Sequence, residues 1–353
     1  MTRILTVVGA RPQFIKAGTV SRALSAHGVD EVLVHTGQHF DANMSEVFFD
    51  ELAIPAPTHN LEVGGGSHGE MTGRQLERVE RVLVETQPRL VLVYGDTNST
   101  LAGALAAAKL GIPVAHVEAG LRSWNRAMPE EINRVLVDHL SALAFAPTAT
   151  AVKNLVAEGI DMATVHQVGD VMYDAALFYR ERARRPADAA IPHDVPFVLC
   201  TIHRPQNTDS PARLRGIIEG LVRSGRHVAW PVHPRTADKL ADLRSSLPDR
   251  IHLLPPVSYL EMAWLETHCS AVATDSGGVQ KEAFFHGKPC VTFREETEWV
   301  ELVEEGSQRL VGADPDAIVT GLSELSAPRP GADLYGTGDA AGAIARVLAE
   351  ATA

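Results

Sequence analysis

The sequence has no apolar stretch approaching 20 residues and only three cysteines among its 353 residues. Without such a stretch, no membrane-spanning helix is expected. Cys200, Cys269 and Cys290 are odd in number and far apart, so we expect reduced thiols rather than a disulfide framework. The apolar run ILTVVGA that follows Arg3 is too short for a secretory signal and predicts a first strand instead. These features lead us to expect a cytoplasmic protein.

Several common cofactor and metal motifs are also missing. No CxxC or HExxH spacing points to a metal. The turn after the first predicted strand is not GxGxxG, and GxxxxGK[ST] is absent. The net charge of -12 argues against general binding to nucleic acid or to anionic membranes, although a local basic cleft could hold phosphates. The proportions of 45% hydrophobic and 22% charged residues are typical of a globular protein, and the length suggests two domains.

Residues 90–131 contain the strongest pattern in the chain. Two apolar runs predict two buried parallel strands joined by an alanine-rich helix. Asp96 follows the first strand, Glu118 follows the second, and Glu130 lies at the start of the next helix. Because ligands bind at the carboxyl ends of parallel strands, we expect these acids to share one crevice, where crowded carboxylates suit proton transfer. For Asp96 alone, a role as a helix cap is the competing interpretation.

Basic residues follow the first predicted strand. Gly9 and Ala10 form a turn of small residues, and a helix is predicted from Phe14 onward. Arg11 and Lys16 flank the start of this helix, a combination that suits an anion. A surface salt bridge is the alternative interpretation of Arg11.

The strand and helix rhythm restarts after a proline-containing linker near residue 186. We therefore predict an α/β protein with two doubly wound Rossmann-like domains that face each other across a cleft. The first domain is expected at 1–185 and carries the carboxylates. The second is expected at 186–353 and binds the nucleotide, with the last helix packing back on the first domain.

Polar residues lie at the ends of three predicted strands in the second half. They are His203, His233, Ser276, Gly277, Gly278 and Glu282. The serine and its two glycines precede a helix and supply an N–H-rich nest suited to a diphosphate. The glutamate lies one turn into that helix and could accept hydrogen bonds from a ribose. The histidines could instead bind a metal, but they lack the short spacing that metal ligands usually have.

Six motifs occur in a fixed order: GARPQFIK, YGDTNSTLAGALAA, HVEAGLRS, MPEEINR, the His203-Arg204 pair and TDSGGVQKEA. In these motifs the chain resembles the non-hydrolysing UDP-N-acetylglucosamine 2-epimerases over nearly its whole length. The resemblance implies a glycosyltransferase-B-like fold, a homodimer, and interconversion of UDP-GlcNAc and UDP-ManNAc in polysaccharide biosynthesis. It also implies an isomerase that needs neither NAD nor metal, with a UDP-sugar as its partner and no nucleic acid or membrane.

The resemblance further implies anti elimination of UDP to a 2-acetamidoglucal, followed by protonation of C2 on the other face and re-addition of UDP. Asp96, Glu118 and Glu130 would be the acid/base carboxylates, and His203 would assist departure of UDP. The residues that would bind the substrate are Arg11, Lys16, Ser276, Gly277 and Glu282.

Two alternatives concern the substrate and the reaction. The segments GGGSHGEMTGR and TEWVELVE look closer to the branch that acts on UDP-2,3-diacetamido-2,3-dideoxyglucuronate, and Gln206 replaces a carboxylate common in the family. Both substrates therefore stay open. The fold alone does not exclude three other functions. The chain could be a retaining glycosyltransferase, a catalytically silent nucleotide-sugar binding protein or a hydrolysing epimerase.

Overall fold

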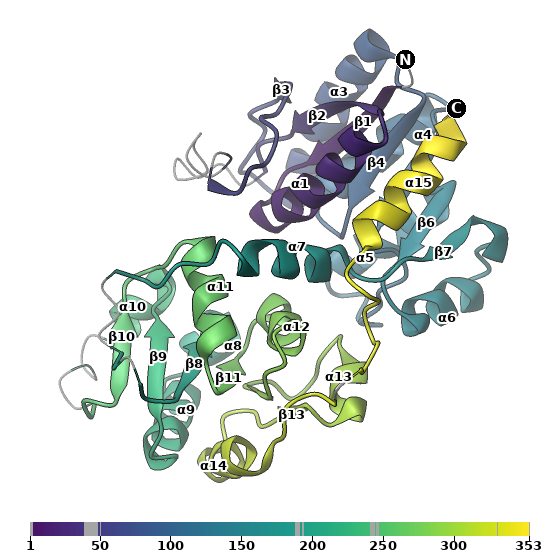
Figure 1. The fold of residues 1–353 in the computed structure, drawn as a ribbon. Coiled ribbons are helices and arrows are strands. Elements are labelled where there is room, and N and C mark those ends of the chain that lie inside the picture. The colour runs from purple at the N-terminus through teal and green to yellow at the C-terminus, as the bar shows by residue number, and fades with distance from the viewer. Residues whose placement is uncertain are drawn as a thin grey trace. The chain divides into compact units, whose positions relative to one another are not determined.

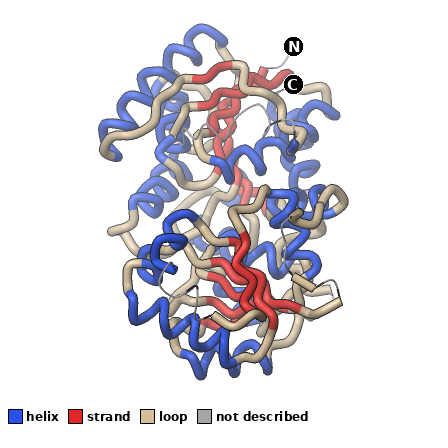
Figure 2. Tube along the Cα trace, turned by 90° about the vertical axis from the view of Figure 1, so that its left-hand side faces the viewer, coloured by secondary structure: helices blue, strands red, loops and turns tan. Residues whose placement is uncertain are grey.

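The computed structural model describes residues 3–38, 49, 51–187, 191–192, 194–240, 244, 247–329 and 331–352. The chain divides into two compact units: unit 1 contains Met1–Ala175 and Asp333–Ala353, and unit 2 contains Ala176–Ala332. Each unit is built on one sheet (Figure 1). In Figure 2 the strands of both sheets are red and the helices around them are blue. Among the described residues, no helix is both long enough and apolar enough to cross a bilayer.

Unit 1 has a seven-stranded sheet in the order β3-β2-β1-β4-β5-β6-β7, and all its pairings are parallel. The strands are β1 (Arg3–Val8), β2 (Asp30–His35), β3 (His59–Asn60), β4 (Leu90–Tyr94), β5 (Val114–Val117), β6 (Leu143–Ala146) and β7 (Val165–Gln167). Strands β4 and β5 are buried along their whole length, which explains their continuous apolar sequences. The strand order reverses beside β1, so the carboxyl ends of β1 and β4 flank the switch point where ligands bind in such sheets.

Residues at the N-termini of the unit 1 helices determine where these helices begin. The Thr97 side chain accepts the N–H of Thr100 and caps α4. Helix α1 begins at Arg11, earlier than the predicted start at Phe14, because Pro12 fits the first turn of a helix. The helices are α1 (Arg11–Ala26), α3 (His68–Thr86), α4 (Asn98–Lys109), α5 (Pro129–Leu140), α6 (Ala149–Ala157), the 3₁₀ helix η1 (Met162–Thr164) and α15 (Ala340–Thr352). Helix α7 (Val171–Arg180) begins in unit 1 and ends in unit 2.

The C-terminal helix α15 belongs to unit 1 and packs against α1 (Figure 1). Its first turn is held by Asp174 of α7, whose carboxylate oxygens accept the N–H groups of Ala340 at 3.1 Å and Ala341 at 2.7 Å. Burial raises the pKa of Asp174 to about 6, and the nearby carboxylates of Asp339 and Asp170 act in the same direction. The folded unit therefore holds a proton on Asp174 at pH values where the unfolded chain has lost it.

This raised pKa predicts how the stability of unit 1 changes with pH. The pKa of Asp174 is higher in the folded state than its ordinary value of 3.8. Asp174 therefore stabilises the folded state most at pH values below 3.8. It is lost as the pH rises through about 6, a change on the order of 2–3 kcal/mol in the free energy of unfolding. In Asp174→Asn this pH-dependent difference should disappear. Urea unfolding of both proteins between about pH 4 and pH 7 measures it, and parallel curves would contradict the prediction.

Unit 2 has a six-stranded sheet in the order β10-β9-β8-β11-β12-β13, again with parallel pairings only. The strands are β8 (Phe197–Thr201), β9 (His227–Pro231), β10 (Ile251–Leu254), β11 (Ala271–Thr274), β12 (Cys290–Thr292) and β13 (Gln308–Leu310). The helices are α8 (Pro205–Thr208), α9 (Pro211–Arg223), α10 (Pro234–Leu240), α11 (Tyr259–His268), α12 (Gly277–Phe285), α13 (Val300–Glu305) and α14 (Pro315–Glu324). The predicted α/β fold with two doubly wound sheets is confirmed.

Candidate functional site

In unit 1, two predicted carboxylates follow neighbouring strands at the same edge of the sheet. Strands β4 and β5 pair in parallel, with Tyr94 opposite Val117, so Asp96 and Glu118 lie in the turns that follow these two strands. The turns that carry them are unusual, because Gly95 has a φ of +62° and Glu118 a φ of +71°. A non-glycine residue in this left-handed region costs conformational energy, and such strain concentrates at functional positions.

Glu118 is buried and pairs with Lys16 of α1. Its side chain is 7% exposed, that of Lys16 is 12% exposed, and a carboxylate oxygen of Glu118 accepts from the Lys16 ammonium. A Cβ atom added to Gly95 would lie 3.3 Å from Glu118 Oε2 and 3.8 Å from Lys16 Nζ. The backbone before Asp96 therefore packs directly against the Glu118–Lys16 pair, and three predicted site residues converge there.

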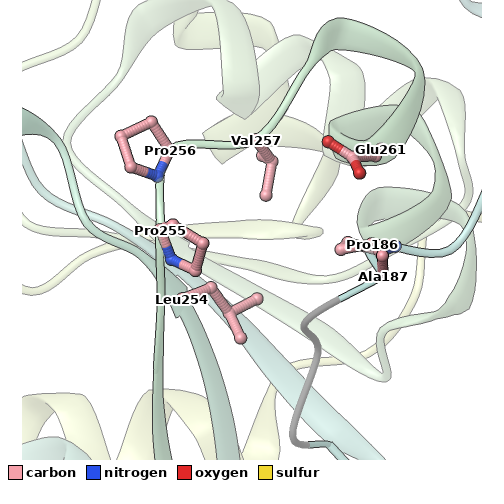
Figure 3. A pocket seen from close by; sticks show the side chains of 7 residues that line it. All are labelled: Pro186, Ala187, Leu254, Pro255, Pro256, Val257 and Glu261. Atoms are coloured by element: carbon pink, nitrogen blue, oxygen red, sulfur yellow. The ribbon is translucent and has the colours of Figure 1, made fainter.

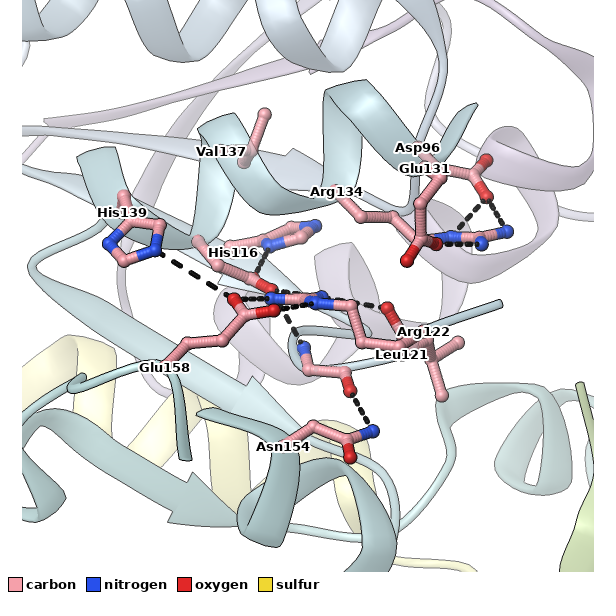
Figure 4. A network of polar contacts seen from close by, with 12 residues as sticks. Asp96, His116, Leu121, Arg122, Glu131, Arg134, Val137, His139, Asn154 and Glu158 are labelled. Carbon is pink, nitrogen blue, oxygen red and sulfur yellow. Dashed lines mark hydrogen bonds and ion pairs between the residues drawn. The ribbon is translucent and has the colours of Figure 1, made fainter. Parts of the chain in front are cut away.

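Asp96 is held by an arginine of the next helix. Arg134 of α5 donates from Nε at 2.9 Å and from Nη2 at 2.6 Å to Asp96 Oδ2. The same guanidinium donates from Nη1 to Glu131 Oε2 at 2.9 Å (Figure 4). Asn133 also donates to the Asp96 backbone carbonyl at 2.9 Å. Arg134 was not among the predicted residues, although its place one turn after the acids of MPEEINR made it a candidate.

The two adjacent glutamates at the start of α5 have different environments. Glu130 is exposed on the first turn. Glu131 is fully buried and accepts the N–H groups of Ser123 at 2.9 Å and Trp124 at 3.0 Å. Burial acts to raise the pKa of Glu131, but these donors and the Arg134 guanidinium outweigh it and lower the pKa below its ordinary value. Glu131 thus secures a loop, whereas Glu130 stays accessible to a ligand.

The turn after β1 joins that strand to β4. Gln13 Oε1 accepts the N–H groups of Gly9 at 2.8 Å and Ala10 at 3.0 Å. Its amide nitrogen donates to the Tyr94 carbonyl at 2.6 Å and to Thr100 Oγ1 at 2.9 Å. These two backbone amides, which the sequence suggested for anion binding, are therefore bonded to Gln13. Arg11 is exposed at the start of α1, so the positive charge predicted there is accessible.

In unit 2, a buried carboxylate organises the segment that contains His203. Asp275 is fully buried and accepts the N–H groups of His203 at 3.0 Å and Arg204 at 3.0 Å, and an Asn207 amide N–H at 3.0 Å. The His203 ring approaches the same carboxylate, with Nδ1 3.1 Å from Oδ1. Burial acts to raise the pKa of Asp275, but His203, Asn207 and the Arg204 amide lower it below its ordinary value.

His203 and His233 lie near each other, as their strand positions predicted. Their ring centroids are 6.0 Å apart, and the His203 side chain is 41% exposed. Thr236 of α10 donates to the Ile202 carbonyl at 2.7 Å, which ties the ends of β8 and β9 together. Among the described residues, no three His, Cys, Asp or Glu side chains converge in a way that could hold a metal ion.

The predicted nest of small residues forms the start of α12. Ser276 caps this helix, and a Cβ atom added to Gly277 would lie 2.5 Å from Glu298 Oε1. Glu298 is paired with Arg294 at 2.9 Å. Burial acts to raise the pKa of Glu298, but the charges of Arg294 and Arg204 lower it below its ordinary value. Two arginines therefore supply positive charge near the helix N-terminus, which Glu298 offsets.

Glu282 lies on α12 and belongs to a buried acid pair. Its side chain accepts from the Tyr259 hydroxyl at 3.5 Å. Burial raises the pKa of the neighbouring Glu266 well above its ordinary value, and the Glu282 carboxylate raises it further. Glu282, the residue predicted to bind the ribose, therefore lies beside a second buried acid.

A small pocket in unit 2 lies at the carboxyl end of β10, where the chain continues into Pro255 and Pro256 (Figure 3). It is lined by Pro186, Ala187, Leu254, Pro255, Pro256, Val257 and Glu261. None of the predicted site residues lines it. Its one carboxylate, Glu261, accepts the N–H of Ser258 at 2.8 Å in a capping box at the start of α11. Glu261 is therefore a structural group.

Known proteins share both the sequence and the fold. The family model described as UDP-N-acetylglucosamine 2-epimerase matches residues 22–349. The chain belongs to this family. It is 52% identical, over 99% of both chains, to a UDP-2,3-diacetamido-2,3-dideoxy-D-glucuronate 2-epimerase of Pseudomonas aeruginosa.

Two solved structures of 2-epimerases superimpose on the whole chain. The Methanocaldococcus jannaschii UDP-GlcNAc 2-epimerase in complex with UDP-GlcNAc and UDP has a TM-score of 0.87 and 40% identity, and covers 99% of this chain and 100% of that one. The Neisseria meningitidis enzyme bound to UDP-GlcNAc has a TM-score of 0.89 and 30% identity, with the same coverage. The predicted family, glycosyltransferase-B-like fold and isomerase class are confirmed.

Proposed function

We propose that this 2-epimerase inverts C2 of UDP-2,3-diacetamido-2,3-dideoxyglucuronate. The observation that supports this substrate is sequence identity. The chain is 52% identical to the Pseudomonas UDP-2,3-diacetamido-2,3-dideoxy-D-glucuronate 2-epimerase and 40% identical to the Methanocaldococcus UDP-GlcNAc 2-epimerase. The segments GGGSHGEMTGR and TEWVELVE support the same branch. UDP-GlcNAc is the second candidate, because the structure at 40% identity holds that nucleotide sugar.

The reaction needs a proton acceptor, a proton donor and a stabilised leaving group. A carboxylate takes the C2 proton, the C–H electron pair forms the C1–C2 double bond, and the C1–O bond to UDP breaks. A carboxylic acid then protonates C2 from the other face, while a UDP oxygen attacks C1. Positioned acids and bases are needed because the C2 proton is weakly acidic, and charge must be neutralised on the departing diphosphate.

Each unit supplies one part of this chemistry. Asp96, Glu118 and Glu130 transfer protons, and His203 stabilises the diphosphate as it leaves. The position of Asp96 and Glu118 at the ends of neighbouring strands and the partial exposure of His203 support these roles. The residues proposed to bind substrate are Arg11, Lys16, His233, Ser276, Gly277, Gly278 and Glu282.

Turnover in deuterated water tests the mechanism. Both the product and the recovered substrate should gain deuterium at C2, without added NAD or metal, because elimination exchanges that proton with solvent. An active enzyme whose product keeps the original C2 hydrogen would exclude elimination.

A comparison of kcat/KM tests the substrate. The enzyme should turn over UDP-2,3-diacetamido-2,3-dideoxyglucuronate with a clearly higher kcat/KM than UDP-GlcNAc when both are assayed side by side. The reverse preference would assign UDP-GlcNAc as the native substrate and leave the C2 chemistry intact.

The proposal includes a homodimer that acts in the cytoplasm on its UDP-sugar. The family resemblance supports both features. Light scattering on the purified protein measures the oligomeric state. The mass of a monomer at the protein concentrations used in the activity assays would refute the dimer.

A further inference from the structure

A buried polar chain lies in unit 1 (Figure 4). It runs from the Gly95 carbonyl through His116, Asp138 and Arg122 to Glu158. The side chains of His116, Asp138 and Arg122 are all fully buried. None of them is needed for the chemistry described above, and leaving charged groups in a protein interior is costly unless each is paired.

The contacts of His116 fix the orientation of its ring. Nδ1 lies 2.7 Å from Asp138 Oδ1, and Nε2 lies 2.8 Å from the carbonyl oxygen of Gly95. A backbone carbonyl can only accept, so Nε2 carries a hydrogen. Burial acts to raise the pKa of Asp138, but His116 and Arg122 outweigh it and lower the pKa. The ring is therefore held from both sides, by the Gly95 carbonyl and by the Asp138 carboxylate.

Asp138 reaches the turns on both sides of the site. Through Oδ1 it orients His116, which holds the Gly95 carbonyl immediately before Asp96. Through Oδ2 it accepts the N–H of Gly120 at 3.1 Å, two residues after Glu118. One carboxylate of α5 is thus connected to the turn that carries Asp96 and to the turn that carries Glu118.

These turns need external support. Gly95, Glu118 and Gly120 all have φ values in the left-handed region, at +62°, +71° and +83°. Gly120 is also confined from the other side, because an added Cβ would lie 2.4 Å from the Ala151 carbonyl oxygen. Glycine adopts such φ values without strain, but Glu118 is not a glycine, and its conformation persists only when its surroundings hold it.

The charges around Asp138 are balanced. Arg122 Nη1 lies 2.7 Å from Asp138 Oδ2, and its Nη2 lies 2.7 Å from Glu158 Oε2. Arg122 therefore lies between two carboxylates, Asp138 and Glu158, and the Asp138 carboxylate also faces the His116 ring. This pairing allows Asp138 to stay ionised in the interior, so that it can accept hydrogen bonds from several donors at once.

We propose that His116 and Asp138 are positioning residues, which hold the Gly95 and Gly120 turns so that Asp96 and Glu118 keep the geometry of proton transfer. Asp138 fixes the ring of His116, and the ring fixes the peptide bond between Gly95 and Asp96. The geometric part of this inference depends only on the contacts within unit 1. Its catalytic consequence rests on the proposed function.

Paired substitutions at His116 test the role in catalysis. His116→Leu keeps an apolar side chain of similar reach but removes the donor to Gly95, and we expect kcat to fall about 10²-fold with little change in KM. His116→Gln restores an N–H donor at the same reach and should recover most of the lost rate. Val137→Ala is the matched control, because Val137 is the fully buried neighbour of Asp138 on α5 and packs in the apolar core.

The control separates positioning from general loosening. Val137→Ala should lower the melting temperature yet keep kcat near the wild-type value in assays well below that temperature. If His116→Leu is folded and keeps wild-type kcat, or if His116→Gln recovers nothing at matched stability, the proposal is wrong.

A measurement without substrate keeps the test independent of activity. In ¹⁵N-histidine-labelled wild-type protein, Nε2 of His116 should show the chemical shift of a protonated nitrogen, because it donates to the Gly95 carbonyl. An Nε2 without a hydrogen would overturn the proposal even if the enzyme is active. A protonated Nε2 in a protein without epimerase activity would refute the proposed function instead and leave the geometry standing.

Discussion

Asp96→Asn and Glu118→Gln are each expected to lower kcat by about 10²–10⁴-fold, the usual contribution of a positioned acid or base. Both substitutions preserve side-chain size, and an amide oxygen can still accept from Arg134 or Lys16, the present partners of these carboxylates. The loss should therefore be in proton transfer, with the affinity for UDP largely unchanged. Stopped assays of C2 inversion and calorimetry with UDP measure the two quantities. An unchanged kcat in either variant would remove that residue from the catalytic set.

The adjacent glutamates of α5 provide an internal comparison for this prediction. Glu130→Gln should lower kcat within the same range without changing the melting temperature, because Glu130 is exposed. Glu131→Gln should lower the melting temperature, because Glu131 is fully buried and holds the Ser123 and Trp124 amides and Arg134. If the two variants behave alike, accessibility does not separate the roles of these residues.

The strand–helix–strand unit in 90–117 could be predicted because its signals are local. The two apolar runs predicted β4 and β5, and the alanine-rich stretch between them predicted α4. Where two signals competed, the prediction was wrong, as at α1, where Arg11 and Pro12 belong to the helix rather than to the preceding turn. The three-residue strands β12 and β13 are too short to show a period of their own.

Those residues of the candidate site that follow a strand could be predicted from the sequence. Asp96, Glu118 and His203 follow strands directly, and parallel strands end at one edge of a sheet. The supporting carboxylates Asp138 and Asp275 could not be recognised, because their partners lie far away in the sequence. A single aspartate carries no sign of whether its side chain is buried, so the residues that hold the site emerge only once the chain is folded.

Asp275→Ala is expected to have the second large effect, a loss of about 3–5 kcal/mol in the stability of unit 2 together with a steep fall in kcat. The substitution removes the acceptor of the His203, Arg204 and Asn207 donors and leaves them unsatisfied in a buried place. Asp275→Asn should restore only part of the lost stability. Its NH₂ group would face the N–H donors of Arg204 and Asn207, which now bond to Oδ2.

The effect of Asp275 should also depend on pH. Because the pKa of Asp275 is lowered in the folded unit, its stabilisation is present above the ordinary carboxyl pKa and is lost as the pH falls through the folded value. Glu324→Gln is the matched control, since Glu324 is 61% exposed and forms a surface ion pair with Arg309 at 3.2 Å in the same unit. It should change neither stability nor kcat measurably. Urea unfolding and initial rates compare the variants, and an Asp275→Ala protein as stable and active as Glu324→Gln would show that His203 does not depend on this carboxylate.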